Sequence, residues 1–101
     1  MTIQDIQENA KELAPKFKDK NPEQRMLYLM TEVGETAIEV LKLQGFRNGG
    51  EKEELKQKLG MEIYDVVWNL CDLANMFGID LEEAFARKIA VNEERFSGRC
   101  I

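Results

Sequence analysis

The 101-residue sequence contains no histidine, which removes the most common general base and the most common transition-metal ligand from consideration. Any chemistry must therefore depend on carboxylates, lysines, arginines or water. The two cysteines, Cys71 and Cys100, have neither the spacing of a zinc site nor that of a disulfide framework. The sequence also lacks a signal peptide and a long apolar run, so we expect a soluble cytoplasmic protein with no membrane partner.

Positive charge is in the minority, with 14 lysines and arginines against 19 acidic residues and a net charge of −5. This balance disfavours a nucleic-acid polymer as a partner, because attraction to phosphates supplies most of the non-specific binding to such polymers. A small phosphate ligand that arrives with metal ions is not disfavoured by the same argument. The length predicts a single domain over residues 1–101, small enough for a partner subunit to help it bury a core.

The hydrophobic pattern predicts an all-α fold with four helical stretches, since no strand pair or internal repeat is present. Asn21 and Pro22 form the start signal of the second stretch, as an N-cap followed by proline at the first helical position. Gly45 and Gly78 are predicted to end the second and third helices, and Asp80 to cap the last one. We expect an antiparallel bundle of four to five helices, completed by dimerisation.

The stretch from Met61 to Phe77 is apolar on several sides, so we expect it to lie at the centre of the bundle. Three neighbouring helices of one chain could not readily cover all of its apolar surface, which predicts at least a homodimer. The second helix is expected to turn one apolar face to the same core. That face comprises Met26, Met30, Val33, Ala37, Val40 and Leu41.

Acidic residues recur at helical spacing on both of these helices. Glu32 and Glu35 share a stripe with Glu39 on the second helix, and the third carries a stripe of Glu62, Asp65, Asn69 and Asp72. If the two helices are antiparallel neighbours, the two acidic pairs Glu32/Glu35 and Glu62/Asp65 form a cluster of four carboxylates. The alternative interpretation is that both stripes face water.

Such a cluster is not stable in the fully ionised, unpaired state, because like charges a few ångströms apart raise one another's pKa. Binding of a divalent metal is the usual solution. Oxygen ligands without histidine or thiolate favour Mg²⁺, or Mn²⁺, over zinc. Magnesium held by carboxylates leaves positions for water and phosphate oxygens, which indicates chemistry on a phosphate ester or phosphoanhydride.

The segment TEVGE at residues 31–35, followed by EIYD at residues 62–65, resembles the ExxE and ExxD motifs of the MazG-like, all-α nucleoside triphosphate pyrophosphohydrolases. Residues 88–96 are similar to the end of that domain, and the resemblance covers residues 22–96. It implies Mg²⁺-dependent hydrolysis of nucleoside triphosphates, with deoxynucleotides favoured, to the monophosphate and pyrophosphate. It also implies a role in housecleaning of the nucleotide pool and a homodimer or dimer of dimers.

The resemblance also implies roles for individual residues. The expected metal ligands are Glu32, Glu35, Glu62 and Asp65, and either Glu35 or Glu39 is expected to accept a proton from the attacking water. The sequence does not decide between these two glutamates. The expected substrate-binding residues are Lys88, Asn92, Arg95, Asn69 and Trp68. Lys18 is added from the basic linker that precedes the region of resemblance, as a candidate phosphate or base contact.

Several alternatives remain open at this point. A phosphoribosyl-ATP pyrophosphohydrolase would share the architecture, and a non-catalytic helical dimerisation module would carry the same acidic stripes as solvated surfaces. Trp68 could stack on a base, but a tryptophan beside Val67 and Leu70 is more often a core or interface residue. Lys88, Asn92 and Arg95, considered alone, form an ordinary solvated helix face, and Lys18 belongs to a basic linker of the kind that is most often solvated.

Overall fold

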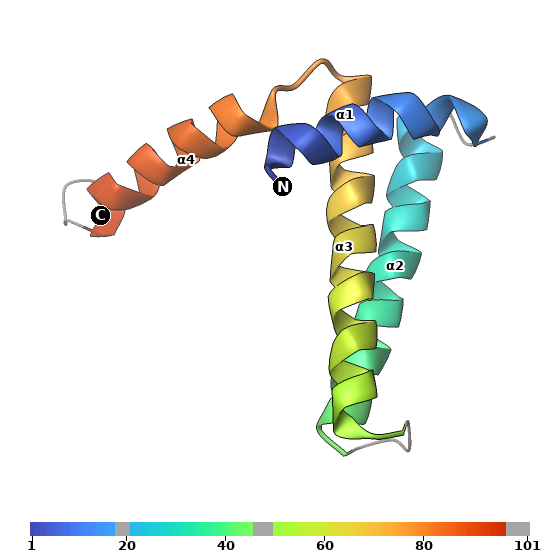
Figure 1. Cartoon of the computed structure of the whole chain (residues 1–101). Coiled ribbons are helices and arrows are strands. Elements are labelled where there is room, and N and C mark those ends of the chain that lie inside the picture. Colours follow the sequence, from blue (N-terminus) through green and yellow to red (C-terminus); the bar gives the residue numbers. More distant parts are fainter. Residues whose placement is uncertain (18–20, 46–49, 97–101) are drawn as a thin grey trace.

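The computed structural model describes residues 1–17, 21–45 and 50–96, and these residues form helices without any strand (Figure 1). This confirms the predicted all-α class. In chain order the elements are α1 (Ile3–Leu13), the short 3₁₀ helix η1 (Ala14–Lys16), α2 (Pro22–Leu43), α3 (Lys52–Met76) and α4 (Leu81–Phe96).

The predicted helix boundaries are confirmed, and their capping groups are in place. The Asn21 side chain accepts a hydrogen bond of 2.8 Å from the backbone N–H of Gln24, which caps α2. Gly45 and Gly78 follow the ends of α2 and α3 with φ of 82° and 66°, a left-handed conformation that glycine adopts without a steric penalty. Asp80 accepts hydrogen bonds from two backbone N–H groups in the first turn of α4.

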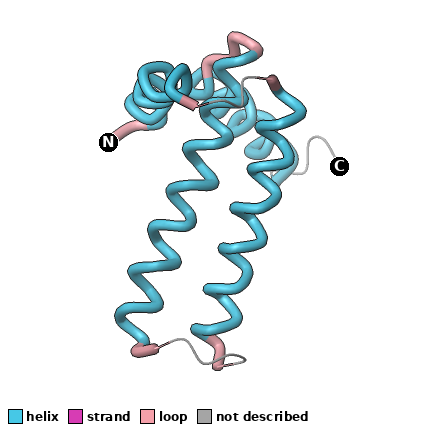
Figure 2. The backbone as a smooth tube through the Cα atoms, turned by 90° about the vertical axis from the view of Figure 1, so that its right-hand side faces the viewer, coloured by secondary structure: helices cyan, strands magenta, loops and turns pink. Residues whose placement is uncertain are grey.

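Helices α2 and α3 form an antiparallel pair, and α1 lies across one end of it (Figures 1 and 2). Helix α4 extends away from the pair (Figure 1). The radius of gyration is 16.6 Å, whereas a compact chain of about 100 residues has a value of about 13 Å. The antiparallel arrangement of the two central helices is therefore as predicted, but one chain does not close the bundle.

The face through which α2 packs against α3 is largely polar. The buried residues of α2 are Arg25, Leu29, Glu32 and Glu39. All six residues that were predicted to face the core are exposed, among them Met30 at 60% and Val33 at 43%. Within one chain α3 does not cover this apolar face, because helical periodicity identifies an apolar face without identifying the neighbour that covers it. That the face belongs to a bundle core completed by a second chain stays a prediction.

One buried side chain, Gln7 of α1, joins three helices. Its Nε2 donates to Asn75 Oδ1 at 3.0 Å and to the Ile79 carbonyl oxygen at 2.9 Å, and its Oε1 accepts from the Leu81 backbone N–H at 3.0 Å. The Asn75 side chain also donates to the backbone carbonyl of Gln7. These bonds connect α1 to the end of α3 and to the start of α4, so they hold α1 across the end of the central pair.

Replacing Gln7 with alanine is expected to lower the free energy of unfolding by about 2 to 3 kcal/mol, because it leaves the backbone groups of Ile79 and Leu81 without their partners. Urea unfolding followed by circular dichroism measures this change. Gln4→Ala, at an exposed position of the same helix, serves as the control and should change stability by no more than about 0.5 kcal/mol. Equal stability of the two variants would contradict the proposed role of Gln7.

Candidate active site

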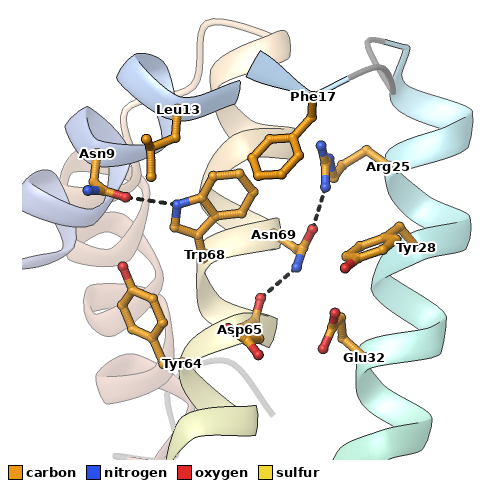
Figure 3. Close-up of a pocket in the computed structure, with 10 residues that line it drawn as sticks. All are labelled: Asn9, Leu13, Phe17, Arg25, Tyr28, Glu32, Tyr64, Asp65, Trp68 and Asn69. Carbon is orange, nitrogen blue, oxygen red and sulfur yellow. Dashed lines mark hydrogen bonds between the residues drawn. The ribbon is translucent and has the colours of Figure 1, made fainter. Parts of the chain in front are cut away.

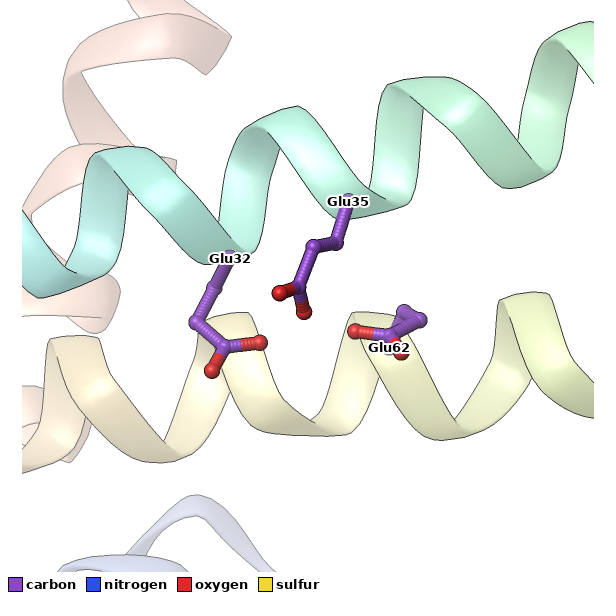
Figure 4. Close-up of side chains that lie close together, drawn as sticks. All are labelled: Glu32, Glu35 and Glu62. Atoms are coloured by element: carbon purple, nitrogen blue, oxygen red, sulfur yellow. The ribbon is translucent and has the colours of Figure 1, made fainter.

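Three carboxylates meet between α2 and α3. Glu32 and Glu35 of α2 and Glu62 of α3 each place one oxygen so that the three atoms lie within 4.8 Å of one another (Figure 4). Glu32 is buried, Glu62 is half-buried and Glu35 is exposed. None of the three forms a salt bridge within the described parts of the chain. We refer to these residues as the acidic group.

The acidic group carries negative charge that no ion pair among the described residues compensates. Burial raises the pKa of Glu32, and the charges of Glu35 and Asp65 act in the same direction, although a hydrogen bond from the Tyr28 hydroxyl opposes the shift. The pKa of Glu62 is also raised, first by burial and then by the neighbouring charges of Glu35, Glu32 and Asp65. A cation at this position would therefore relieve an unfavourable concentration of charge.

Two oxygens of the acidic group also lack hydrogen-bond donors. Glu32 Oε2 and Glu62 Oε2 are buried, and no donor in residues 1–17, 21–45 or 50–96 reaches them. Buried polar atoms are rarely left without a partner, so each such atom requires an explanation. Carboxylate oxygens are the preferred ligands of hard divalent cations, and the acidic group therefore fits Mg²⁺ or Mn²⁺.

The other two predicted carboxylates lie near the acidic group but outside it. Asp65 is exposed and contributes to the local negative potential, yet its oxygens are not among those within 4.8 Å of one another. Glu39 is buried at the same α2–α3 interface, where its Oε1 lies 3.4 Å from the Nζ of Lys42. The chain thus brings three of the four predicted ligands together, while Glu39 pairs with a lysine.

A pocket of about 460 Å³ lies beside the acidic group and shares Glu32 with it (Figure 3). This volume is within the range of small-molecule sites. Trp68 lies in its wall, where Nε1 donates to Asn9 Oδ1 at 3.0 Å and the ring of Phe17 approaches edge-on with a centroid distance of 5.8 Å. The lining residues are Asn9, Leu13, Phe17, Arg25, Tyr28, Glu32, Tyr64, Asp65, Trp68 and Asn69.

The sequence did not predict Arg25, which is only 3% exposed and links the two central helices. Its Nη1 donates to Asn69 Oδ1 at 2.6 Å, and its Nε lies 2.8 Å from Asp72 Oδ2. Burial raises the pKa of Asp72, and the charge of Arg25 opposes that shift. Helical spacing could have identified this pair in the sequence. Arg25 precedes Glu32 by seven residues and therefore lies on the same stripe of α2. Asp72 follows Asp65 by seven residues and lies on the stripe of α3 that faces it.

The predicted phosphate contacts on α4 are not near the acidic group within one chain. Lys88 and Arg95 are exposed, Asn92 is half-buried, and α4 runs away from the α2–α3 pair (Figure 1). Lys18 lies outside the described residues. The other two predicted substrate contacts, Trp68 and Asn69, both line the pocket.

None of the helices in the described segments is long and apolar enough to cross a membrane.

Similar proteins were found for most of the chain. Residues 20–97 match the family described as the MazG nucleotide pyrophosphohydrolase domain. A crystal structure of iMazG from Vibrio DAT 722 is 33% identical with a TM-score of 0.63, and the match covers 94% of this chain and 97% of that chain. No curated protein matches.

Replacing Glu62 with glutamine is expected to raise the melting temperature in metal-free buffer, because it removes one of the mutually repelling charges in the acidic group. Mg²⁺ or Mn²⁺ at about ten times its dissociation constant should stabilise the wild type by about 1.4 kcal/mol and the variant by much less. Thermal unfolding with and without metal measures both effects.

The control is Glu53→Gln on the same helix, where the side chain is 81% exposed and lies 3.7 Å from Lys56. This variant should retain the metal-dependent shift of the wild type. An identical shift for Glu62→Gln would show that Glu62 does not bind the metal.

Proposed function

The chain belongs to the MazG nucleotide pyrophosphohydrolase family, and from this premise we propose that it hydrolyses nucleoside triphosphates to the monophosphate and pyrophosphate with the help of Mg²⁺. The observation that carries the proposal is the acidic group, in which two buried oxygens have no donor among the described residues and which lies beside a pocket of suitable volume. A preference for deoxynucleotides, from the sequence resemblance, is part of the proposal.

Glu32, Glu35 and Glu62 hold the metal in this proposal, and Asp65 is the fourth ligand because its charge acts on the same site. Mn²⁺ is expected to substitute for Mg²⁺, since both accept carboxylate oxygens. A bound divalent cation supplies Lewis acidity toward water and phosphate oxygens.

The proton of the attacking water goes to Glu35 in this proposal. Glu35 is the exposed member of the acidic group and is therefore open to water and substrate. Glu39 is the second candidate, but its Oε1 is already within 3.4 Å of the Lys42 ammonium. One oxygen of Glu39 is thus already in contact with a lysine, whereas Glu35 faces solvent.

The pocket receives the base and sugar, and the triphosphate extends from it toward the acidic group. Glu32 supports this orientation because it lines the pocket and also belongs to the acidic group. Trp68 supplies an aromatic surface for the base, and such stacking is tolerant of base identity. Asn69 contributes to the same wall.

A second copy of the chain is required to complete the site. The apolar face of α2 is exposed, and on α4 Phe85 and Ile89 are 50% and 57% exposed. A homodimer, or a dimer of dimers, would cover these faces and bring Lys88, Asn92 and Arg95 of one copy to the substrate phosphates of another. Arginine suits that position because it contacts phosphate oxygens in a bidentate manner.

Pyrophosphate release tests the activity directly, with a panel of ribo- and deoxynucleoside triphosphates, phosphoribosyl-ATP and no substrate, each with Mg²⁺ or with a chelator. We expect metal-dependent release with nucleoside triphosphates. Glu35→Gln should lower turnover at least about 100-fold, because it removes both a metal ligand and the proposed proton acceptor. Glu39→Gln, one turn away, should lower it far less. The reverse order would assign the proton transfer to Glu39.

Co-expression of two inactive variants tests whether the site is shared between copies. Subunits with Glu62→Gln and subunits with Arg95→Ala should together recover about a quarter of wild-type activity, because half of the dimers are mixed and one of their two sites is intact. The matched control pairs Glu62→Gln with Glu35→Gln, which damage the same site and should recover nothing. No recovery in the first pair would remove α4 from the partner's site.

A further inference from the structure

Arg25 has features that a purely structural ion pair does not need. A buried ion pair contributes little net stability, and well-packed hydrophobic residues of similar volume often do as well or better. Arg25 is 3% exposed and its partner Asp72 is 3% exposed, so both charges have lost their hydration. The position of the guanidinium in the wall of the pocket suggests that the pair serves the pocket rather than the fold alone.

The guanidinium holds the Asn69 amide in one orientation. Asn69 Oδ1 accepts from Arg25 Nη1 at 2.6 Å, while Asn69 Nδ2 donates to the Asp65 backbone carbonyl at 2.7 Å (Figure 3). Because the oxygen and the nitrogen of the amide are both engaged, a rotation of the side chain would break two hydrogen bonds. Asn69 is therefore a fixed part of the wall, and its orientation depends on Arg25.

The same guanidinium lies between aromatic side chains of the two central helices. It is 5.6 Å from the ring centroid of Tyr28 on α2 and 5.5 Å from that of Trp68 on α3. Both distances are within the range of cation–π attraction, which favours a planar guanidinium over an ammonium. Arg25 therefore sets the positions of the aromatic walls on both sides of the pocket.

Among the lining residues that the structure describes, Arg25 alone carries a positive charge, whereas Glu32 and Asp65 carry negative charge on the side of the acidic group. The pocket thus has two chemically different ends. The end with Arg25, Asn69 and Trp68 suits a neutral planar base, and the end with Glu32 is continuous with the metal-binding carboxylates.

We propose that Arg25 is a positioning residue for base recognition, which acts through Asn69, Tyr28 and Trp68 and not on the phosphates. This inference rests on the proposed function of the same site. If the proposal is correct, the contribution of the base to the binding free energy depends on the planar guanidinium of Arg25. Binding of the triphosphate to the metal does not depend on it.

Two variants test the proposal. Arg25→Lys keeps the charge and loses the planar fork, and the double variant Arg25→Met/Asp72→Leu removes both partners so that no buried charge is left unpaired. In both, KM for nucleoside triphosphates should rise at least about tenfold while kcat changes by less than about threefold. The values of kcat/KM for nucleoside triphosphates that carry different bases should become more similar to one another. The inhibition constant of inorganic tripolyphosphate, which has no base, should stay unchanged.

A second measurement does not require turnover. Trp68 is the only tryptophan of the chain, so its fluorescence reports on this pocket alone. Titration with nucleoside monophosphates should give a dissociation constant that rises by the same factor as KM in the two variants. Arg87→Met, which removes an exposed arginine paired with Glu83 at 2.8 Å, is the control and should behave as the wild type.

The outcomes separate the two hypotheses. A wild type without hydrolysis would refute the proposed function, whatever Arg25 does. With an active wild type, an unchanged KM in folded variants would reduce Arg25 to a structural role. A parallel rise of KM and of the tripolyphosphate inhibition constant, or loss of cooperative unfolding in both variants, would also overturn the proposal.

Discussion

The negative charge between α2 and α3 is the constraint on which the remainder of the structure depends. Most helix pairs bury mainly apolar residues at their interface, but here Glu32, Glu39, Asn69 and Asp72 are buried as well. Buried carboxylates require cations or donors. The α2–α3 pair can therefore be stable only if every buried carboxylate at this interface has a cation or a hydrogen-bond donor beside it. The partner differs along the interface, and this difference defines the site.

Along the interface the neutralising partner changes from one turn to the next. Asp72 is paired with the chain's own Arg25, and Glu39 lies beside Lys42. Between these two pairs lies the acidic group, for which the described residues supply no cation. The gap between two protein-neutralised segments is where an external cation fits, and the pocket lies between this gap and Arg25.

Burying charge inside the pair places apolar residues on its outside. In the part of the chain that the structure describes, the buried hydrophobic residues are Ala10, Leu29, Leu55, Cys71 and Ala74. The accessible surface is 7610 Å², whereas a compact monomer of this mass is expected to expose about 5,900 Å². The excess is about twice the roughly 800 Å² that each partner buries in a standard protein–protein interface. The polar interface and the proposed oligomer therefore have one common cause.

The sequence by itself determined the features that depend on neighbouring residues. The helices, their caps at Asn21 and Asp80, the terminating glycines and the acidic pairs were all predicted, because capping and helical periodicity operate within a few residues. Only the tertiary structure decided which face of α2 meets α3, that Arg25 pairs with Asp72, and that Asp65 and α4 lie apart from the acidic group. These outcomes depend on contacts between residues far apart in the chain, and a periodic pattern that identifies two faces of a helix contains no information on which neighbour each face will meet.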